Sequence, residues 1–151
     1  MSAPRQPLHA TVAAVRLGGA WRGALIQGPS GVGKSDLALR LMRNGWRLVG
    51  DDWVHAFACG GALYAAAPAT IAGRMEVRGL GIIDRPFLPL ARIVLSLRLT
   101  HEPVERLPAA ALDVVEGVVL PRLTLDPRPA SAPLVVGAAM ADLSAPCDGA
   151  L

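Results

Sequence analysis

The residues best suited to chemistry form a glycine-rich octet, GPSGVGKS, at 28–35. It fits the pattern G-x-x-x-x-G-K-[ST] and holds the only lysine of the chain, beside fourteen arginines. Glycines in such an octet let successive backbone N–H groups point into one concavity, which suits a polyphosphate. Lys34 can reach the β- and γ-phosphates of a nucleotide, and the Ser35 hydroxyl can bind Mg²⁺. The residues predicted to cradle the phosphates are Gly28, Pro29, Ser30, Gly31, Val32, Gly33, Lys34 and Ser35.

The single lysine indicates a crowded site. If position 34 needed only a positive charge, the composition of this chain would favour arginine. An ammonium group is a compact point charge, whereas a guanidinium is a larger planar fork. The sequence therefore predicts a phosphate site in which only the smaller cation fits.

Two adjacent carboxylates follow the hydrophobic run RLVG at residues 47–50. In an open α/β sheet the carboxyl ends of strands face the ligand crevice, so Asp51 and Asp52 are expected beside the octet. An acid at this place can hold Mg²⁺ or its waters, as we expect for Asp51, and it could equally serve as a base toward a hydroxyl nucleophile. A solvated Asp–Asp turn is the alternative without a function.

Three further residues have no functional signal in their own local sequence. Glu76, in the stretch MEVRGLGIID, would form a surface salt bridge with Arg74 or Arg78. His9 would be a histidine at a strand edge. Arg106 would be a solvated arginine.

The elements that must position these residues can be read from hydrophobic periodicity. A strand is expected before the octet, joined by a turn at Gly18–Gly19 to an earlier strand. A helix is expected from Lys34, with its apolar face formed by positions 37, 38, 41 and 42 and its end at Asn44–Gly45. A strand before and a helix after the octet argue against a chance glycine turn.

Beyond the carboxylate pair the sequence predicts mostly short strands. The expected elements are a hairpin over 54–66, a short helix at 68–74, a loop between short ordered pieces at 75–84, a strand at 92–100, a segment at 118–126 broken by Pro121, and a terminal helix at 134–144.

Composition sets the class of protein. The chain has 151 residues, which suits one domain, and a formal net charge of +3 with scattered arginines, which argues against a nucleic-acid partner. Its apolar stretches are interrupted well short of the roughly 20 residues that a membrane span needs. The first ten residues lack the apolar core of a secretory signal, and the two cysteines show no zinc spacing, so a cytoplasmic protein is expected.

The order of these motifs resembles a known family. GPSGVGKSDLALRLMRNGWRLVGDD followed by MEVRGLGIID resembles the catalytic domain of HPr kinase/phosphorylase, the bacterial enzyme that phosphorylates a serine of the phosphocarrier protein HPr. The resemblance extends from about His9 to Met140 and leaves out the usual amino-terminal regulatory domain, as in short forms of some alphaproteobacteria. It implies an α/β P-loop domain over 1–151, with a mixed central sheet and a core like that of phosphoenolpyruvate carboxykinase.

The resemblance also implies a role for each matching residue. Asp52 matches the general base, Lys34 the phosphate-binding lysine and His9 the histidine before the first strand. Ser35 and Glu76 match the two Mg²⁺ ligands. Arg106 matches a catalytic arginine, although its context here is Glu-Arg-Leu where the family has Asp-Arg-Leu.

The implied activity is ATP- and Mg²⁺-dependent phosphorylation of HPr by a homo-hexamer. The family's glycine-arginine-asparagine loop, tied to the reverse, dephosphorylating reaction, is replaced here by PRPASAPL, so the resemblance implies the kinase and leaves the reverse reaction open. Two other readings stay open. One is a small-molecule P-loop kinase, and the other is a catalytically silent nucleotide sensor.

Overall fold

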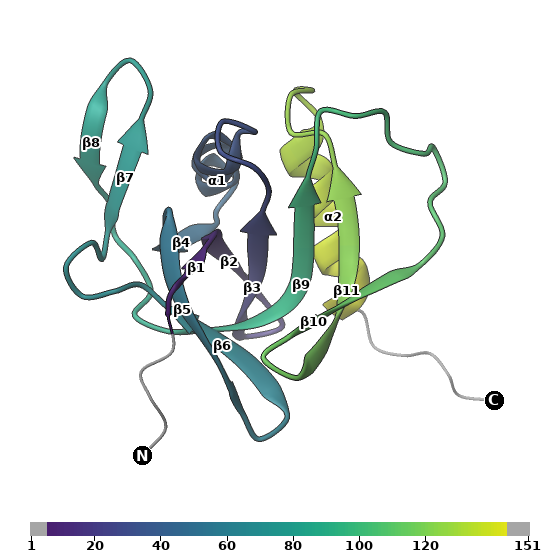
Figure 1. Cartoon of the computed structure of the whole chain (residues 1–151), viewed down its shortest axis with the longest axis horizontal. Helices are drawn as coiled ribbons and strands as arrows, with labels where there is room; N and C mark the ends of the chain where they lie inside the picture. The colour runs from purple at the N-terminus through teal and green to yellow at the C-terminus, as the bar shows by residue number, and fades with distance from the viewer. Residues whose placement is uncertain (1–5, 145–151) are drawn as a thin grey trace.

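The structure, a computed structural model, describes residues 6–144 (Figure 1). Over these residues the chain forms two helices and eleven strands. The helices are α1 (Lys34–Arg43) and α2 (Ala132–Ser144). The strands are β1 (Leu8–His9), β2 (Thr11–Leu17), β3 (Ala20–Gln27), β4 (Arg47–Gly50), β5 (Trp53–Cys59), β6 (Ala62–Ala66), β7 (Arg74–Val77), β8 (Gly81–Asp84), β9 (Ala91–Leu99), β10 (Ala111–Val115) and β11 (Val118–Leu125). The expected mixed α/β class is confirmed.

One mixed sheet organises the molecule. Its strands follow the order β1-β5-β6-β9-β3-β2-β4, and β11 joins it by pairing with β9. The first part of β9 pairs with β6, and its last four residues pair with β11, so the sheet divides along one side of this strand. Strands β3, β9 and β11 are mutually parallel, and their carboxyl ends reach the same edge (Figure 1).

Both helices pack on one face of the sheet. The apolar side of α1 is buried as the periodicity predicted, with Leu37, Ala38 and Leu41 fully inaccessible. They pack against Leu97 of β9 and Met140 of α2 in one hydrophobic cluster. Burial of side chains of this size stabilises the fold by roughly 1.5–3 kcal/mol each, which fixes the beginning of α1 against the sheet.

A second cluster lies among the strands β2, β5, β6 and β9. Its members include Val12, Val54, Leu63 and Ile93, all almost wholly buried. This cluster holds the β5–β6 hairpin, predicted over 54–66 and found at Trp53–Ala66, against the central strands. No helix among the described residues is long and apolar enough to span a membrane.

The expected helix at 68–74 is wrong. Two turn hydrogen bonds occupy the segment, from Ile71 N to the Pro68 carbonyl and from Arg74 N to the Ile71 carbonyl. Gly73 has a φ of +77°, which ends any helical run, and a Cβ there would come within 2.8 Å of Phe87. The chain therefore turns tightly toward β7.

The segment expected as a loop at 75–84 is largely a hairpin. Strands β7 and β8 pair antiparallel from Arg74↔Asp84 to Val77↔Gly81. Of the two glycines that suggested a loop, Gly79 lies in the turn and Gly81 begins β8; their φ values of +87° and +119° favour glycine at both positions. Figure 1 shows this hairpin standing apart from the central sheet, next to α1.

Pro121 does not interrupt β11. The strand runs from Val118 to Leu125, and Pro121 pairs with Leu112 of β10. The ladder with β9 begins only at Arg122, so Pro121 has a registered neighbour on one side alone. A residue without an N–H is tolerated where a strand lacks a second neighbour.

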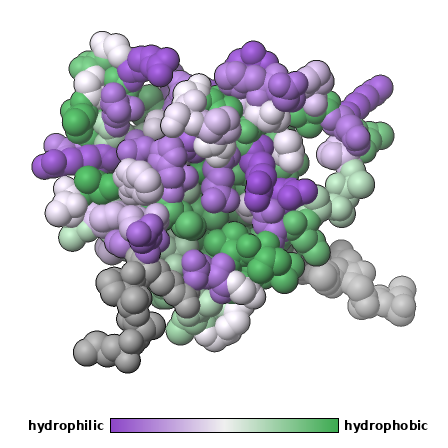
Figure 2. Space-filling view, in the orientation of Figure 1, coloured by the Kyte–Doolittle hydropathy of each residue, from purple (hydrophilic) through white to green (hydrophobic). Residues whose placement is uncertain are grey.

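Apolar side chains are also exposed on the β10–β11 hairpin. Leu112, Val114 and Val119 are 64%, 67% and 57% exposed. Val114 lies directly opposite Val119 in the ladder, so the two share one face. Figure 2 shows hydrophobic surface gathered over the lower part of this view, where Figure 1 places the hairpin, whereas the upper edge is mostly hydrophilic.

One buried carboxylate holds this hairpin to β9. Asp113 accepts hydrogen bonds from Ser96 (2.7 Å), Arg98 (3.1 and 3.2 Å) and Arg122 (3.1 Å). Burial alone would raise the pKa of Asp113, but these hydrogen bonds outweigh it and hold the pKa below its ordinary value of 3.8. The carboxylate is therefore more stable in the folded chain than in the unfolded one.

We expect Asp113→Asn to lower the free energy of unfolding by about 2 kcal/mol at pH 7, because two guanidinium groups lose their buried partner. Since the folded-state pKa is depressed, the contribution is complete above pH 3.8 and disappears as the pH falls through the lower folded-state value. Urea denaturation of both chains between pH 7 and pH 3 measures this. Asp142→Asn, at an exposed position of α2, is the matched control and should change stability little. An Asp113→Asn effect that is constant with pH would contradict the assignment.

Candidate functional site

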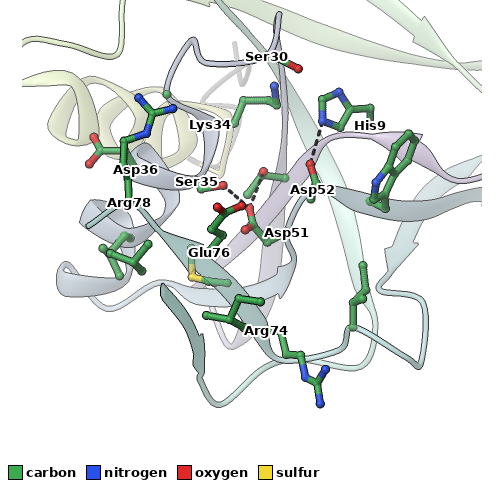
Figure 3. Close-up of a pocket in the computed structure, with 18 of the residues that line it drawn as sticks. His9, Ser30, Lys34, Ser35, Asp36, Asp51, Asp52, Arg74, Glu76 and Arg78 are labelled. Carbon is green, nitrogen blue, oxygen red and sulfur yellow. Dashed lines mark hydrogen bonds and ion pairs between the residues drawn. The ribbon is translucent and has the colours of Figure 1, made fainter. Parts of the chain in front are cut away.

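A cavity of about 680 Å³ lies at the beginning of α1. Pockets of about 300–1,000 Å³ are typical of small-molecule sites. Its walls come from the glycine-rich loop and α1, from the β4–β5 junction and from β7 (Figure 3). The sequence-predicted residues among its lining are His9, Ser30, Gly31, Gly33, Lys34, Ser35, Asp51, Asp52 and Glu76.

The glycine-rich loop leads from β3 directly into α1. Gly31 and Gly33 have φ values of +81° and +116°, a conformation that side chains with a Cβ rarely adopt. Gly28 is needed for space, because a Cβ there would lie 2.9 Å from Val32 and 3.0 Å from the Leu99 carbonyl. The octet therefore forms the tight turn that its composition predicted.

Lys34 is folded into this turn. Its Nζ donates hydrogen bonds to the carbonyls of Gly28 (2.8 Å) and Pro29 (3.2 Å), and the residue is only 7% exposed. Burial lowers the pKa of Lys34, while the charges of Asp52 and Asp51 act in the opposite direction. The ammonium thus lies within a cup of backbone groups, close to both carboxylates.

Asp51 is the buried member of the carboxylate pair. It is 6% exposed, and its Oδ1 accepts hydrogen bonds from the hydroxyls of Ser35 (2.7 Å) and Thr11 (2.9 Å). These contacts join the end of β4, the first turn of α1 and the start of β2. Sequence reasoning missed Thr11, because only the pairing of β2 with β4 brings it to this carboxylate.

Asp52 points the other way. Its side chain is 63% exposed, and Oδ1 lies 2.9 Å from Nε2 of His9. Its φ is +70°, and Trp53 N donates to the Asp51 carbonyl at 2.8 Å across it, so Asp52 is the middle residue of a three-residue turn. That conformation is rare and strained, and it aims two neighbouring carboxylates in different directions.

His9 is held on its other side by an aromatic ring. The imidazole and the Trp53 indole have centroids 5.0 Å apart. Strand β1 pairs His9 with Trp53, so the backbone register fixes this contact. Trp53 therefore packs on the histidine, which in turn contacts Asp52.

Glu76 reaches the cavity from β7. Figure 3 shows its carboxylate directed toward Ser35 and Asp51. Arg74 and Arg78, on either side of it in the sequence, also line the cavity. No three His, Cys, Asp or Glu side chains gather into a metal cage among residues 6–144. Two carboxylates and a hydroxyl are nevertheless a set that suits Mg²⁺ when substrate phosphates complete the coordination.

Arg106 is not brought to this cavity. It is exposed on the segment between β9 and β10, and it is absent from the lining. Its catalytic role stays a prediction from sequence alone. The arginines that line the cavity, Arg74 and Arg78, come from the β7–β8 hairpin instead.

Known proteins are similar to this chain in part of its sequence. Residues 3–88 match the family model of the HPr serine kinase C-terminal domain. The HPr kinase/phosphorylase of Clostridium tetani is 47% identical over 76 residues, which are 50% of this chain and 25% of that protein. The enzyme of the same name from Limosilactobacillus reuteri is 47% identical over 83 residues, 54% of this chain and 25% of that protein. The matched regions thus span about a quarter of the length of these relatives.

A solved structure shares the fold. The Hpr(Ser) kinase/phosphatase from Coxiella burnetii superposes with a TM-score of 0.77 over 91% of this chain and 95% of that one, at 24% sequence identity. The family match covers the glycine-rich octet, the carboxylate pair and the β7–β8 hairpin, which are the elements that build the cavity. The chain belongs to the family of the HPr serine kinase C-terminal domain.

Proposed function

We propose that this chain is an ATP-dependent protein serine kinase whose substrate is HPr. The observation that carries the proposal is the divided carboxylate pair beside the glycine-rich loop. Asp51 is buried against Ser35, whereas Asp52 faces the open cavity next to the Lys34 charge. A phosphoryl-transfer site needs both a metal-side carboxylate and an accessible base, and this turn supplies one of each.

The phosphate end of the nucleotide is bound by the loop. Backbone N–H groups between Gly28 and Gly33 and the first turn of α1 favour negative charge. Lys34 adds a compact cation inside the same cup. When the phosphates bind, Nζ would exchange its hydrogen bonds to the two loop carbonyls for hydrogen bonds to phosphate oxygens.

Ser35, Asp51 and Glu76 are the residues that would hold Mg²⁺. The oxygen-only donor set and the approach of Glu76 to the Ser35–Asp51 pair fit this ion (Figure 3). A bound Mg²⁺ would neutralise charge on the β- and γ-phosphates. Thr11 donates a hydrogen bond to Asp51 and thereby holds the carboxylate in one orientation before the metal binds.

Asp52 accepts the proton of the incoming seryl hydroxyl. As the serine oxygen forms its bond to the γ-phosphorus, the bond from that phosphorus to the β–γ bridging oxygen breaks, and ADP leaves with that oxygen. His9 contacts Asp52 at 2.9 Å and fixes the side-chain rotamer from the side of Trp53. The strained turn keeps the carboxylate pointed at the substrate rather than into the protein.

Several finer features belong to the same proposal. We place the reaction in the cytoplasm and treat residues 1–151 as one P-loop catalytic domain with a core like that of phosphoenolpyruvate carboxykinase. The exposed apolar side chains of the β10–β11 hairpin support self-association, and the hexamer of the family resemblance is the proposed assembly. The reverse reaction would use a protonated Asp52 as the acid toward the leaving serine oxygen.

We expect Asp52→Asn to reduce phosphoserine formation on HPr by about 10²–10⁴-fold, because an amide cannot accept the proton. The affinity for ATP should change little, since Asp52 lies outside the glycine-rich loop. Phosphoserine can be followed by mass spectrometry of purified HPr incubated with enzyme, ATP and Mg²⁺. Wild-type transfer in the variant would remove the base assignment. Absence of phosphoserine with the wild-type chain at high concentration would favour the nucleotide-sensor reading.

Lys34→Arg tests the crowding argument, because it keeps the charge and changes only its shape. The Lys34 side chain is nearly buried between two loop carbonyls, so we expect the larger guanidinium to weaken nucleotide binding about tenfold or more. Arg43→Lys, at the exposed end of α1, is the control and should leave binding unchanged. Isothermal titration with ATP and Mg²⁺ measures both, and an unaltered affinity in Lys34→Arg would refute the argument.

A further inference from the structure

A histidine that follows β9 contacts the glycine-rich loop. Nε2 of His101 lies 2.9 Å from the carbonyl oxygen of Val32, within the octet. We propose that His101 is a positioning residue for phosphate binding, because it holds the peptide unit between Val32 and Gly33 with its N–H directed toward the nucleotide phosphates. The inference rests on the proposed function and adds to it a residue that does not itself line the cavity containing Lys34.

The chemistry of the two groups decides which one donates. A carbonyl oxygen can only accept a hydrogen bond, so Nε2 of His101 carries the hydrogen. The neutral ring with its hydrogen on Nε2 and the imidazolium both meet this requirement. The contact is therefore a hydrogen bond to the loop that needs no charge on the ring.

The orientation of this peptide unit determines where its N–H points. In a trans peptide the C=O and N–H bonds point in opposite directions. Because the Val32 carbonyl is directed at His101, the N–H of Gly33 points away from the histidine. Gly33 lines the cavity that contains Lys34, and its N–H donates to no residue that the structure describes. This N–H is therefore a donor available to a phosphate oxygen in that cavity.

The groups on either side of this peptide unit have contacts of their own. Val32 N donates to the Pro29 carbonyl at 3.1 Å, and the Val32 side chain is buried in the core. The Gly33 carbonyl accepts from Leu37 N at 3.0 Å. Between them the unit ends at a glycine with a φ of +116°, and glycine has the widest choice of backbone angles. The hydrogen bond from His101 is what restricts the rotation of this unit.

Backbone contacts on both sides of His101 hold it beside the loop. Thr100 N donates to the Leu125 carbonyl at 3.0 Å, and Glu102 N donates to the Thr100 hydroxyl at 3.0 Å. Arg128 donates from Nη2 to the His101 carbonyl at 3.1 Å. Because β3, β9 and β11 are parallel and end at the same edge, these contacts place the imidazole next to the loop after β3 (Figure 1).

An ion pair fixes the arginine of this group. The carboxylate of Asp126 accepts hydrogen bonds from Nε (3.0 Å) and Nη2 (2.9 Å) of Arg128. Hydrogen bonds from the side chain and backbone of Arg128 lower the pKa of Asp126 to about 2, so the pair stays ionised at neutral pH. A continuous set of contacts thus runs from Asp126 through Arg128 and His101 to the Val32 carbonyl.

The test uses tripolyphosphate with Mg²⁺, because this probe occupies the loop without a base or a sugar. His101→Phe keeps a flat ring and removes the donor. We expect it to raise the dissociation constant about threefold to tenfold, the effect of one lost hydrogen bond. His101→Gln supplies an amide N–H in place of the ring N–H and should restore most of the affinity. His55→Phe, at an exposed position of β5, is the matched control and should bind as the wild-type chain does. Isothermal titration of the full chain measures all four proteins.

A second measurement separates positioning from a general effect on folding. In amide NMR spectra of isotope-labelled protein, the Gly33 signal should shift when tripolyphosphate and Mg²⁺ bind to the wild-type chain. At saturating probe the shift should be clearly smaller in His101→Phe and be restored in His101→Gln. Because His101 is exposed, urea denaturation should give equal stabilities for the wild-type chain and both variants.

The outcomes distinguish this inference from the proposed function. Unchanged tripolyphosphate affinity in His101→Phe would overturn it, as would equal losses in His101→Phe and His101→Gln or an undiminished Gly33 shift. None of these results would affect the kinase proposal. The expected pattern without phosphoserine on HPr would instead leave the role of His101 standing and refute the kinase.

Discussion

The arrangement of the site depends on one buried carboxylate. Asp51 is almost inaccessible to water, and a carboxylate in such a place is costly unless donors surround it. Ser35 and Thr11 meet this need with hydrogen bonds of 2.7 and 2.9 Å. Because the two hydroxyls belong to α1 and β2, their hydrogen bonds to Asp51 fix α1, β2 and the end of β4 relative to one another. The glycine-rich loop has no regular secondary structure, so its position is set by β3 before it and α1 after it.

The exposed position of Asp52 follows from the burial of Asp51. Two adjacent carboxylates cannot both enter one apolar crevice without a large desolvation cost. The three-residue turn resolves this by giving Asp52 a φ of +70° and aiming it at His9 and the open cavity. Identical side chains thus acquire different environments, one bound by hydroxyls and one by an imidazole. In the proposed reaction this difference separates the metal-side carboxylate from the base.

The sequence predicted the parts of this site that are local in the chain. The octet, the helix after it and the Asp–Asp pair could be recognised because their spacing reflects backbone geometry within a few residues. Thr11 could not be recognised, since a threonine at the start of an apolar run does not indicate which strand will pair beside it.

The elements that follow the carboxylate pair were harder to predict. The glycines at 79 and 81 indicated a break in regular structure, but they did not indicate whether the break would be a loop or a hairpin turn. The predicted helix at 68–74 is wrong because Gly73 takes a φ of +77°, and its contact with Phe87, which leaves no room for a Cβ, is a tertiary feature that the local sequence does not show. Arg106 was assigned from a three-residue context, and so short a context carries no information on where a long connection will lie.

The division of the sheet along β9 explains why a further cavity, of about 330 Å³ at the beginning of α2, could not be predicted from the sequence. The last four residues of β9 leave β6 and pair with β11, which brings a strand from the end of the chain next to the strand that precedes the loop. The walls of this cavity come from residues 101–104 and from the segment 125–135, which are brought together by the parallel pairing of β9 with β11 and by the hydrogen bond from Arg128 to the His101 carbonyl. Because β3, β9 and β11 are parallel, their carboxyl ends lie at the same edge of the sheet. The segments that follow these three strands are therefore neighbours. The loop after β3 thus has different surroundings on its two sides, since the cavity with Lys34, Asp51 and Asp52 lies on one side and the smaller cavity with Glu102 and several apolar side chains lies near the other.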